Sequence, residues 1–464
     1  IITLAVFCSW LFTKESVTVH GIAAATVSLI LFELGLMLCI PRAVKFFSGW
    51  EEPSPVESLG ERSSKRSRLH PLVSIFLVVL VSRIMVILAA YAIAMLSGYR
   101  GTLFSTLKSI WYKLDTDAVH YANIAENWYT TEFPSAWALV FLPFYPICIR
   151  AANLIFHDTF VSAFVLNLLF SSGAGVVLYE LALCDMGKRA SRFAVFCAFA
   201  LPAAIFYTAP MSEPLFLLLT VSALLAIRKE KFILAGIFGG LAAFTRSVGI
   251  VLLVPFGAEA IAYWVRLYKA EKAKGSGLEK RRLAGAMAKA AVGALLLAAG
   301  TGAYLLINKL LWGDWFKFMQ LQKENWSQSL GWFFNTASYQ TELLFQKIAD
   351  GNVKTAIGLW LPNLLYIFGT LAVFIATARY LRTSYVLYFA AYFAVAIGAT
   401  WLLSAPRYLT ALAVLPIAIA KLCEGRDDGV GLKRARGKAV LIGALMIVGQ
   451  VIYLAFYVLR YKLY

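Results

Sequence analysis

Residues 71–97 read PLVSIFLVVLVSRIMVILAAYAIAMLS, an apolar run that contains one charged side chain, Arg83. A helix of about 20 apolar residues crosses the hydrocarbon core of a bilayer. Similar runs recur along the chain, and we expect an all-α polytopic membrane protein with about 11–13 transmembrane helices. The expected spans are 1–13, 21–41, 71–97, 159–184, 193–209, 213–227, 232–246, 247–265, 285–311, 356–378, 384–404, 407–423 and 438–459.

Composition supports this class. Of the 464 residues, 61% are hydrophobic and 15% are charged, whereas about a quarter of the residues in an average soluble domain are charged. The net charge of +18 comes from short basic loops such as ERSSKRSR (61–68) and KRARGK (433–438). Basic short loops mark the cytoplasmic side of a membrane protein. The charge therefore indicates topology, and we expect membrane lipid as a partner and no nucleic acid.

Placing the basic loops inside puts residues 98–136 and 312–355 outside, together with the turns at Ser212-Glu213, Arg246-Ser247 and Arg407. Residues 137–157 are apolar, but prolines interrupt them, so we expect a re-entrant or interfacial segment there. The charged stretch 51–70 predicts a cytoplasmic linker between N-terminal transmembrane helices (1–50) and a catalytic transmembrane domain (71–464).

The first outer segment contains Asp115, Asp117 and His120 among aromatic residues. At helical spacing Asp117, His120 and Tyr121 share one face, so the histidine could orient the carboxylate. A carboxylate beside apolar walls is suited to general base chemistry. An interfacial aromatic belt is the alternative interpretation.

A second candidate is Glu213 in APMSEPLF (209–216). An acid at membrane depth is costly and indicates function. Alternatively, Ser212 caps a helix that starts here, and the helix dipole favours Glu213 in its first turn.

Three arginines lie in or at the ends of apolar segments: Arg83, Arg246 and Arg407. Arginine binds phosphate with two parallel hydrogen bonds, so these residues are candidates for contact with a lipid-linked phosphate. Snorkelling to the headgroups would also explain Arg246 and Arg407. The stretch WGDWFKF (312–318) adds Asp314 and Trp315, which suit contact with a sugar ring.

Cofactor signatures are absent from the sequence. It has no GxxxxGK[ST] phosphate loop and no His or Cys pair at metal-ligand spacing, so we expect neither a cofactor nor a metal.

In order along the chain, DAVHYANIAENWY (117–129), FLPFYP (141–146), FYTAPMSEPLF (206–216), LAGIFGGLAAFTRSVGI (234–250), WGDWFKF and PRYL (406–409) resemble the PIG-V-type mannosyltransferases. These are GT-C enzymes related to the second mannosyltransferase of GPI-anchor synthesis, and this chain looks like a prokaryotic relative. Two positions depart from the family pattern. Thr116 precedes Asp117 where the family has tryptophan, which makes Asp115 a rival base, and Met211 replaces an aromatic residue.

The resemblance implies an inverting transfer of mannose from a polyprenyl (dolichyl-type) phosphate donor to a glycolipid acceptor, such as a GPI-like precursor, on the outer or lumenal face. That face belongs to the plasma membrane of a prokaryote or to the endoplasmic reticulum of a eukaryote. Asp117 would be the base, with His120 or Glu213 orienting it or the acceptor. The substrate-binding candidates are Arg83, Tyr121, Ser212, Arg246, Asp314, Trp315, Arg407 and Tyr408. The alternatives are a GT-C transferase for another sugar or a protein acceptor, and a lipid or solute transporter.

Overall fold

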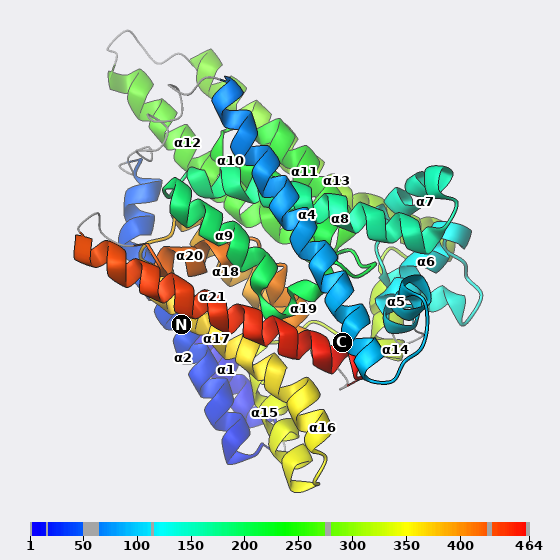
Figure 1. The fold of residues 1–464 in the computed structure, drawn as a ribbon. Coiled ribbons are helices and arrows are strands. Elements are labelled where there is room, and N and C mark those ends of the chain that lie inside the picture. The colour runs from blue at the N-terminus through cyan, green and yellow to red at the C-terminus, as the bar shows by residue number, and fades with distance from the viewer. Residues whose placement is uncertain are drawn as a thin grey trace.

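The computed structural model describes residues 2–14, 17–49, 65–112, 116–273, 280–424 and 429–460. Asp115 and most of the expected linker 51–70 lie outside these residues. Helices dominate the described ranges (Figure 1). The helices of the first half are α1 (Ile2–Thr13), α2 (Val19–Phe47), α4 (Lys65–Leu96), α5 (Leu103–Trp111), α6 (Asp117–Asn127), α7 (Phe144–Phe156), α8 (Thr159–Leu183), α9 (Lys188–Ala200) and α10 (Glu213–Arg228). Those of the second half are α11 (Phe232–Thr245), α12 (Leu253–Ala273), α13 (Lys280–Trp312), α14 (Lys317–Trp326), α15 (Phe333–Ala349), α16 (Val353–Thr355), α17 (Leu361–Thr377), α18 (Thr383–Ile397), α19 (Ala405–Thr410), α20 (Leu415–Leu422) and α21 (Gly429–Val458).

Tighter or wider turns join several of these helices. Three short 3-10 helices and one π-helical turn occur in the described ranges: η1 (Ser135–Val140), η2 (Pro202–Tyr207), η3 (Ser247–Leu252) and the π-turn η4 (Ala356–Trp360).

Seven helices in the described part of the chain are long and apolar enough to cross a membrane. They are Val19–Phe47, His70–Leu96, Thr159–Leu183, Ser247–Ala273, Lys280–Trp312, Val353–Thr377 and Lys433–Val458. Shorter apolar helices, among them Phe232–Thr245 and Thr383–Ile397, pack between them. The protein is therefore an integral, multi-pass, all-α membrane protein.

Helix α10 lies at the centre of the bundle and is buried over nearly its whole length. It packs against α8 on one side and α11 on the other, and α11 packs against α13. The N-terminal helices pack against the second half of the chain, where α2 contacts α15 and α17. The indole of Trp10 also donates a hydrogen bond to Asn335 at 3.0 Å.

Helices α11 and α13 approach unusually closely, as the small residues of 235–249 predict. A methyl group added at Gly236 would lie 2.2 Å from the carbonyl oxygen of Gly293. One added at Gly300 would lie 1.8 Å from the carbonyl oxygen of Gly240. Only glycine allows this backbone contact.

Three of the expected spans are interrupted or end early: 193–209, 384–404 and 407–423. In 384–404, helix α18 ends at Ile397. Segment 193–209 divides into α9 and η2 at Leu201, whose extended backbone (φ −51°, ψ 142°) precedes Pro202. Segment 407–423 divides into α19 and α20, which has Pro416 in its first turn. In 137–157, α7 follows Pro143 and has 13 residues, fewer than a crossing needs.

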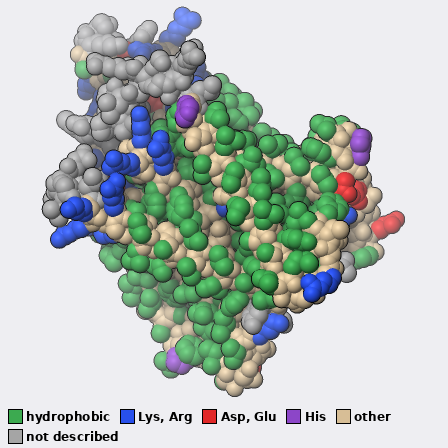
Figure 2. Space-filling view, viewed as in Figure 1, with side chains coloured by type: hydrophobic (Ala, Val, Ile, Leu, Met, Phe, Trp, Pro, Cys, Tyr) green, Lys and Arg blue, Asp and Glu red, His purple; other side chains and the backbone are tan. Residues whose placement is uncertain are grey.

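Charged side chains are unevenly distributed along the bundle (Figure 2), although basic side chains are visible at both ends. Lysine and arginine gather at the end where α12 finishes and α21 begins, and acidic side chains show at the other end. Helices α5, α6 and α14 lie at this second end, away from the basic loops (Figure 1).

Candidate active site

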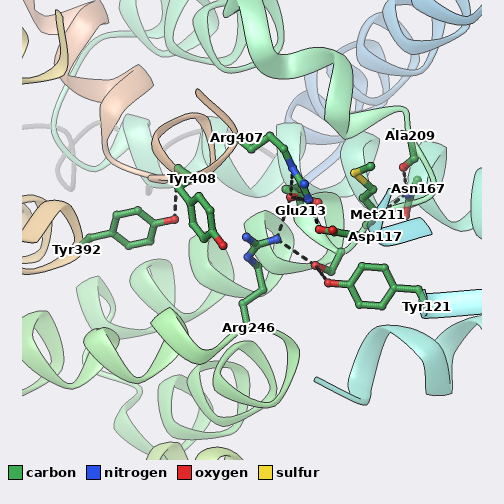
Figure 3. A network of polar contacts seen from close by, with 11 residues as sticks. Asp117, Tyr121, Asn167, Ala209, Met211, Glu213, Arg246, Tyr392, Arg407 and Tyr408 are labelled. Carbon is green, nitrogen blue, oxygen red and sulfur yellow. Dashed lines mark hydrogen bonds and ion pairs between the residues drawn. The ribbon is translucent and has the colours of Figure 1, made fainter. Parts of the chain in front are cut away.

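Four charged side chains from distant parts of the sequence meet in one cluster (Figure 3). Arg407 lies between two carboxylates: its Nη2 donates to Asp117 Oδ2 at 2.7 Å and to Glu213 Oε1 at 2.6 Å. Arg246 Nη1 donates to the same Glu213 Oε1 at 2.8 Å. The cluster thus contains two carboxylates and two guanidiniums, and their formal charges cancel.

Each of these residues lies where a helix begins or ends. Asp117 is in the first turn of α6, and Glu213 is in the first turn of α10, positions that the helix dipole favours for acids. Arg246 ends α11 in an extended conformation (φ −146°, ψ 137°). Arg407 lies on the short helix α19, which has proline in its first turn. Helix ends therefore bring the charges together without placing them in mid-helix.

The capping role expected for Ser212 is wrong. Ser212 precedes α10, but its side chain makes no cap hydrogen bond. Its hydroxyl instead accepts from Arg246 Nη1 at 3.1 Å and shares a 2.8 Å hydrogen bond with the Tyr121 hydroxyl. Ser212 therefore links Tyr121 of α6 to the ion-pair cluster.

Glu213 is 1% exposed, whereas the Asp117 side chain is 31% exposed. Within the described residues, the hydrogen bonds of Asp117 use Oδ2, and those of Arg246 use Nη1. Asp117 Oδ1 and the other nitrogens of Arg246 are thus left for a ligand. Burial alone would raise the pKa of Asp117, but the charge and hydrogen bond of Arg407, together with the charge of Arg246, lower this pKa below its usual value. Asp117 is therefore ionised at neutral pH.

A cavity of about 800 Å³ adjoins the cluster. Asp117, Tyr121, Arg246, Arg407 and Tyr408 all line it. A cavity of this size falls within the usual range for sites that hold a small molecule or a cofactor.

Aromatic rings support the two arginines. The Arg246 guanidinium lies 5.1 Å from the centre of the Tyr408 ring, and that of Arg407 lies 5.0 Å from the centre of the Phe206 ring. The Tyr392 hydroxyl donates to the Tyr408 carbonyl oxygen at 2.8 Å, as Figure 3 shows. Both guanidiniums are thus held in place without a further carboxylate.

His120 does not orient Asp117 as the helical spacing predicts. Its ring stacks on Phe141 at 4.7 Å and meets the edge of Trp326 at 6.3 Å. No hydrogen bond joins it to Asp117 within the described ranges. Burial lowers the pKa of His120, and the negative charge of Asp117 opposes this only in part. His120 is therefore a neutral ring beside the cavity, and Arg407 holds Asp117 instead.

Arg83 lies away from the cavity. It is 1% exposed and donates to the carbonyl oxygens of Ala204 at 2.7 Å and Phe199 at 2.6 Å. These carbonyls belong to the break between α9 and η2, so Arg83 stabilises that break. The phosphate contact expected of it has no support in this geometry.

Asp314 and Trp315 do not line the cavity either. Asp314 accepts from the backbone N–H of Phe316 at 2.9 Å, a local turn, and Trp315 is 45% exposed. Trp326, eleven residues after Trp315, lines the cavity instead.

Asn167 is a functional candidate that sequence reasoning missed. From the buried α8 its side-chain amide donates to the carbonyls of Ala209 and Met211, the latter at 3.0 Å. It thereby fixes the turn that presents Ser212 and Glu213 (Figure 3). Its signal in the sequence is an asparagine within an apolar span, which is costly unless it has partners.

A metal site does not stand out in the described ranges, where no three His, Cys, Asp or Glu side chains come together as ligands. Asp117 and Glu213 already pair with arginine. The polar groups at the cavity are suited to binding an anion and accepting a proton.

No protein-family model and no curated protein matches the sequence. Among solved structures, ArnT from Cupriavidus metallidurans bound to undecaprenyl phosphate aligns at 14% identity with a TM-score of 0.45, over 86% of this chain and 76% of that one. The archaeal oligosaccharyltransferase AglB from Archaeoglobus fulgidus, in complex with an inhibitory peptide and a dolichol-phosphate, aligns at 12% identity with a TM-score of 0.39. That alignment covers 85% of this chain and 56% of AglB, so this chain spans just over half of AglB.

Proposed function

We propose that this protein is a GT-C glycosyltransferase that transfers a sugar from a polyprenyl phosphate donor to a glycolipid acceptor. One observation carries the proposal. A carboxylate with an available oxygen, Asp117, lies beside the guanidiniums of Arg246 and Arg407 on the wall of a cavity of about 800 Å³. The motif order described above favours mannose as the sugar, with a GPI-like precursor as one candidate acceptor.

The residues divide between the two halves of the reaction. Asp117 accepts the proton of the acceptor hydroxyl as its oxygen attacks the anomeric carbon. The bond between that carbon and the phosphate oxygen breaks, and the polyprenyl phosphate leaves with the electron pair. Donors on Arg246 and Arg407 stabilise the charge that develops on the phosphate. Attack from the side opposite the phosphate inverts the anomeric carbon.

Glu213 acts through the arginines. It is buried and accepts from both guanidiniums, so it holds them side by side and offsets their repulsion. Because the four charges cancel, an incoming phosphate group meets two guanidiniums that are already paired. Its binding then depends on the donor nitrogens that the carboxylates leave unused.

By the positive-inside rule, the basic end of the bundle is expected to face the cytoplasm. The cavity lies away from that end, so we propose that it opens to the outer or lumenal face. This corresponds to the plasma membrane in a prokaryote and to the endoplasmic reticulum in a eukaryote.

The test is transfer of labelled mannose from polyprenyl phosphate mannose to a lipid extract by the purified protein in liposomes. Asp117→Asn is expected to lower the rate about 10²- to 10⁴-fold, the usual contribution of a general base. Asp115→Asn separates the two rival bases, because only one of the variants should lose this factor. The melting temperature of each variant is the control for folding.

Two results would contradict the proposal. If the wild type transfers none of several polyprenyl-linked sugars with acceptor lipid present, the reaction class is wrong. If Asp117→Asn instead leaves movement of lipid across the bilayer intact, the transporter interpretation gains support.

A further inference from the structure

A second part of the cavity lining carries no charge. It comes from α14 and the residues after it, and from the segment 398–404 that leads into α19. Two tryptophans, Trp326 and Trp401, lie among its residues, together with the amides of Gln322, Asn325 and Gln328. Among the described lining residues, the charges come from Asp117, Arg246, Arg407 and Arg460.

Hydrogen bonds join the two segments into one wall. Leu330 and Ala399 form an antiparallel bridge, and Thr400 N donates to the Ser329 carbonyl at 2.8 Å. The side chain of Gln328 donates to the Trp401 carbonyl at 2.8 Å. The wall is therefore a fixed part of the cavity, formed by helix α14, the residues after it and the segment 398–404.

The two rings are held by aromatic neighbours. Trp401 stacks on Tyr339 with ring centres 5.8 Å apart, and Trp326 meets Phe141 at 5.8 Å. Trp401 is still 37% exposed, so part of its ring remains open to a ligand. Fixed aromatic rings suit the C–H faces of a sugar ring, which pack on them as apolar surface.

The amides are only partly used. Gln322 donates to the Gln328 side chain at 2.5 Å, but its own Oε1 enters no described hydrogen bond. The Asn325 side chain likewise has no partner within the described residues. An amide offers both a donor and an acceptor, as a pair of sugar hydroxyls does.

We propose that this wall is a subsite for a neutral sugar ring of the acceptor, with Trp326 and Trp401 contacting the ring and Gln322 and Asn325 binding its hydroxyls. The identity of the ligand as an acceptor rests on the function proposed above. A phosphorylated or charged peptide group would find no counter-charge on this wall, and an acyl chain would leave its amides unpaired. The wall thus favours a glycan acceptor over a protein or a bare lipid.

The first test is binding without catalysis. Saturation-transfer NMR with a dimannoside is expected to show binding to the purified wild type, and the variant Gln322→Ala/Asn325→Ala should bind it about tenfold more weakly. Trp401→Phe keeps the packing on Tyr339 and should weaken binding less than the amide variant. The controls on the same helix are Lys323→Ala and Met319→Ala, which alter exposed side chains outside the lining. Absence of dimannoside binding to the wild type, or equal affinity in the amide variant and the controls, would overturn the subsite.

The second test is the transfer reaction. The amide variant should raise the acceptor KM about tenfold and leave the donor KM within twofold. Transfer with an unchanged acceptor KM would overturn the subsite and leave the proposed function standing. Dimannoside binding that depends on Gln322 and Asn325, with no transfer from any donor, would overturn the proposed function and leave the subsite standing.

Discussion

Replacing Glu213 by glutamine tests the charge balance of the cluster. Glu213 is 1% exposed, and the side chains of its partners Arg407 and Arg246 are 7% and 11% exposed. Glu213→Gln leaves two guanidiniums facing the single carboxylate of Asp117, which is 31% exposed and so a weaker partner. Removing one partner of a buried ion pair costs about 3–5 kcal/mol. We expect a loss near the lower end, about 3 kcal/mol, because glutamine retains one acceptor oxygen.

A second substitution makes the test specific. Arg246→Gln alone leaves an excess negative charge, but Glu213→Gln/Arg246→Gln restores a neutral pair of Asp117 and Arg407. The double variant should therefore lose about as much stability as Glu213→Gln alone. Its loss would then be smaller than the sum of the two single losses by about 2–3 kcal/mol, which is the coupling energy between the two sites. The control is Asp350→Asn, which breaks the exposed Lys347–Asp350 pair and should cost at most about 0.5 kcal/mol.

The assay is unfolding of the purified variants in one detergent, followed by circular dichroism and by tryptophan fluorescence. Losses that simply add in the double variant would refute the reasoning, because they would mean that the charges do not sense one another. A loss for Glu213→Gln no larger than for Asp350→Asn would refute it as well.

Four further predictions concern Arg83, Gly300, Asp117 and His120. Arg83→Met should lower the free energy of unfolding by about 3 kcal/mol, because it leaves two buried carbonyl oxygens without a hydrogen bond. The KM for the sugar donor should stay unchanged. A raised KM for the sugar donor would mean that Arg83 contributes to the site. Gly300→Ala should destabilise by about 1–3 kcal/mol through overpacking, whereas Gly302→Ala, which meets nothing within 4 Å, should have little effect in the same melting experiment. The transfer rate should not fall between pH 8 and 6.5 through titration of Asp117, because its lowered pKa keeps the carboxylate charged until the pH drops below 3.8. His120, whose pKa is also lowered, stays neutral above pH 6.5, so stability that it contributes should decline only below that pH, and His120→Gln should remove this decline.

The long helices were predictable because a continuous apolar run has one favourable structure in a bilayer. The expected span 159–184 corresponds to α8 (Thr159–Leu183), and 71–97 overlaps α4 (Lys65–Leu96) in all but its last residue. The break at Leu201 was not predictable from the local sequence, although Pro202 marked a candidate position. The carbonyl oxygen of Leu201 accepts from Gln450 at 3.1 Å, and the Ala203 N–H donates to Tyr366 at 2.8 Å. Partners from distant helices satisfy the broken backbone.

The charged residues of the site could be identified because acids and arginines are rare in apolar surroundings. Their pairing could not, since Asp117 and Arg407 are 290 positions apart in sequence. The position of Gln322 and Asn325 at the cavity could not be predicted, because amides in a polar segment are ordinary. Long-range contacts such as the bridge between Leu330 and Ala399 place this segment at the cavity.

The segment 398–404 connects the aromatic wall of the cavity to the helix that carries Arg407. On one side it is bonded to the residues that follow α14, and on the other it runs directly into α19, which carries Arg407. Any change in the backbone of this segment would therefore reach both the wall that contains Trp401 and the placement of Arg407 between Asp117 and Glu213. By thermodynamic reciprocity, if a ligand at the wall changes the affinity of the cluster for a second ligand, the second ligand changes the affinity of the wall by the same factor. This short segment thus connects the proposed acceptor subsite directly to the ion pairs that hold Asp117.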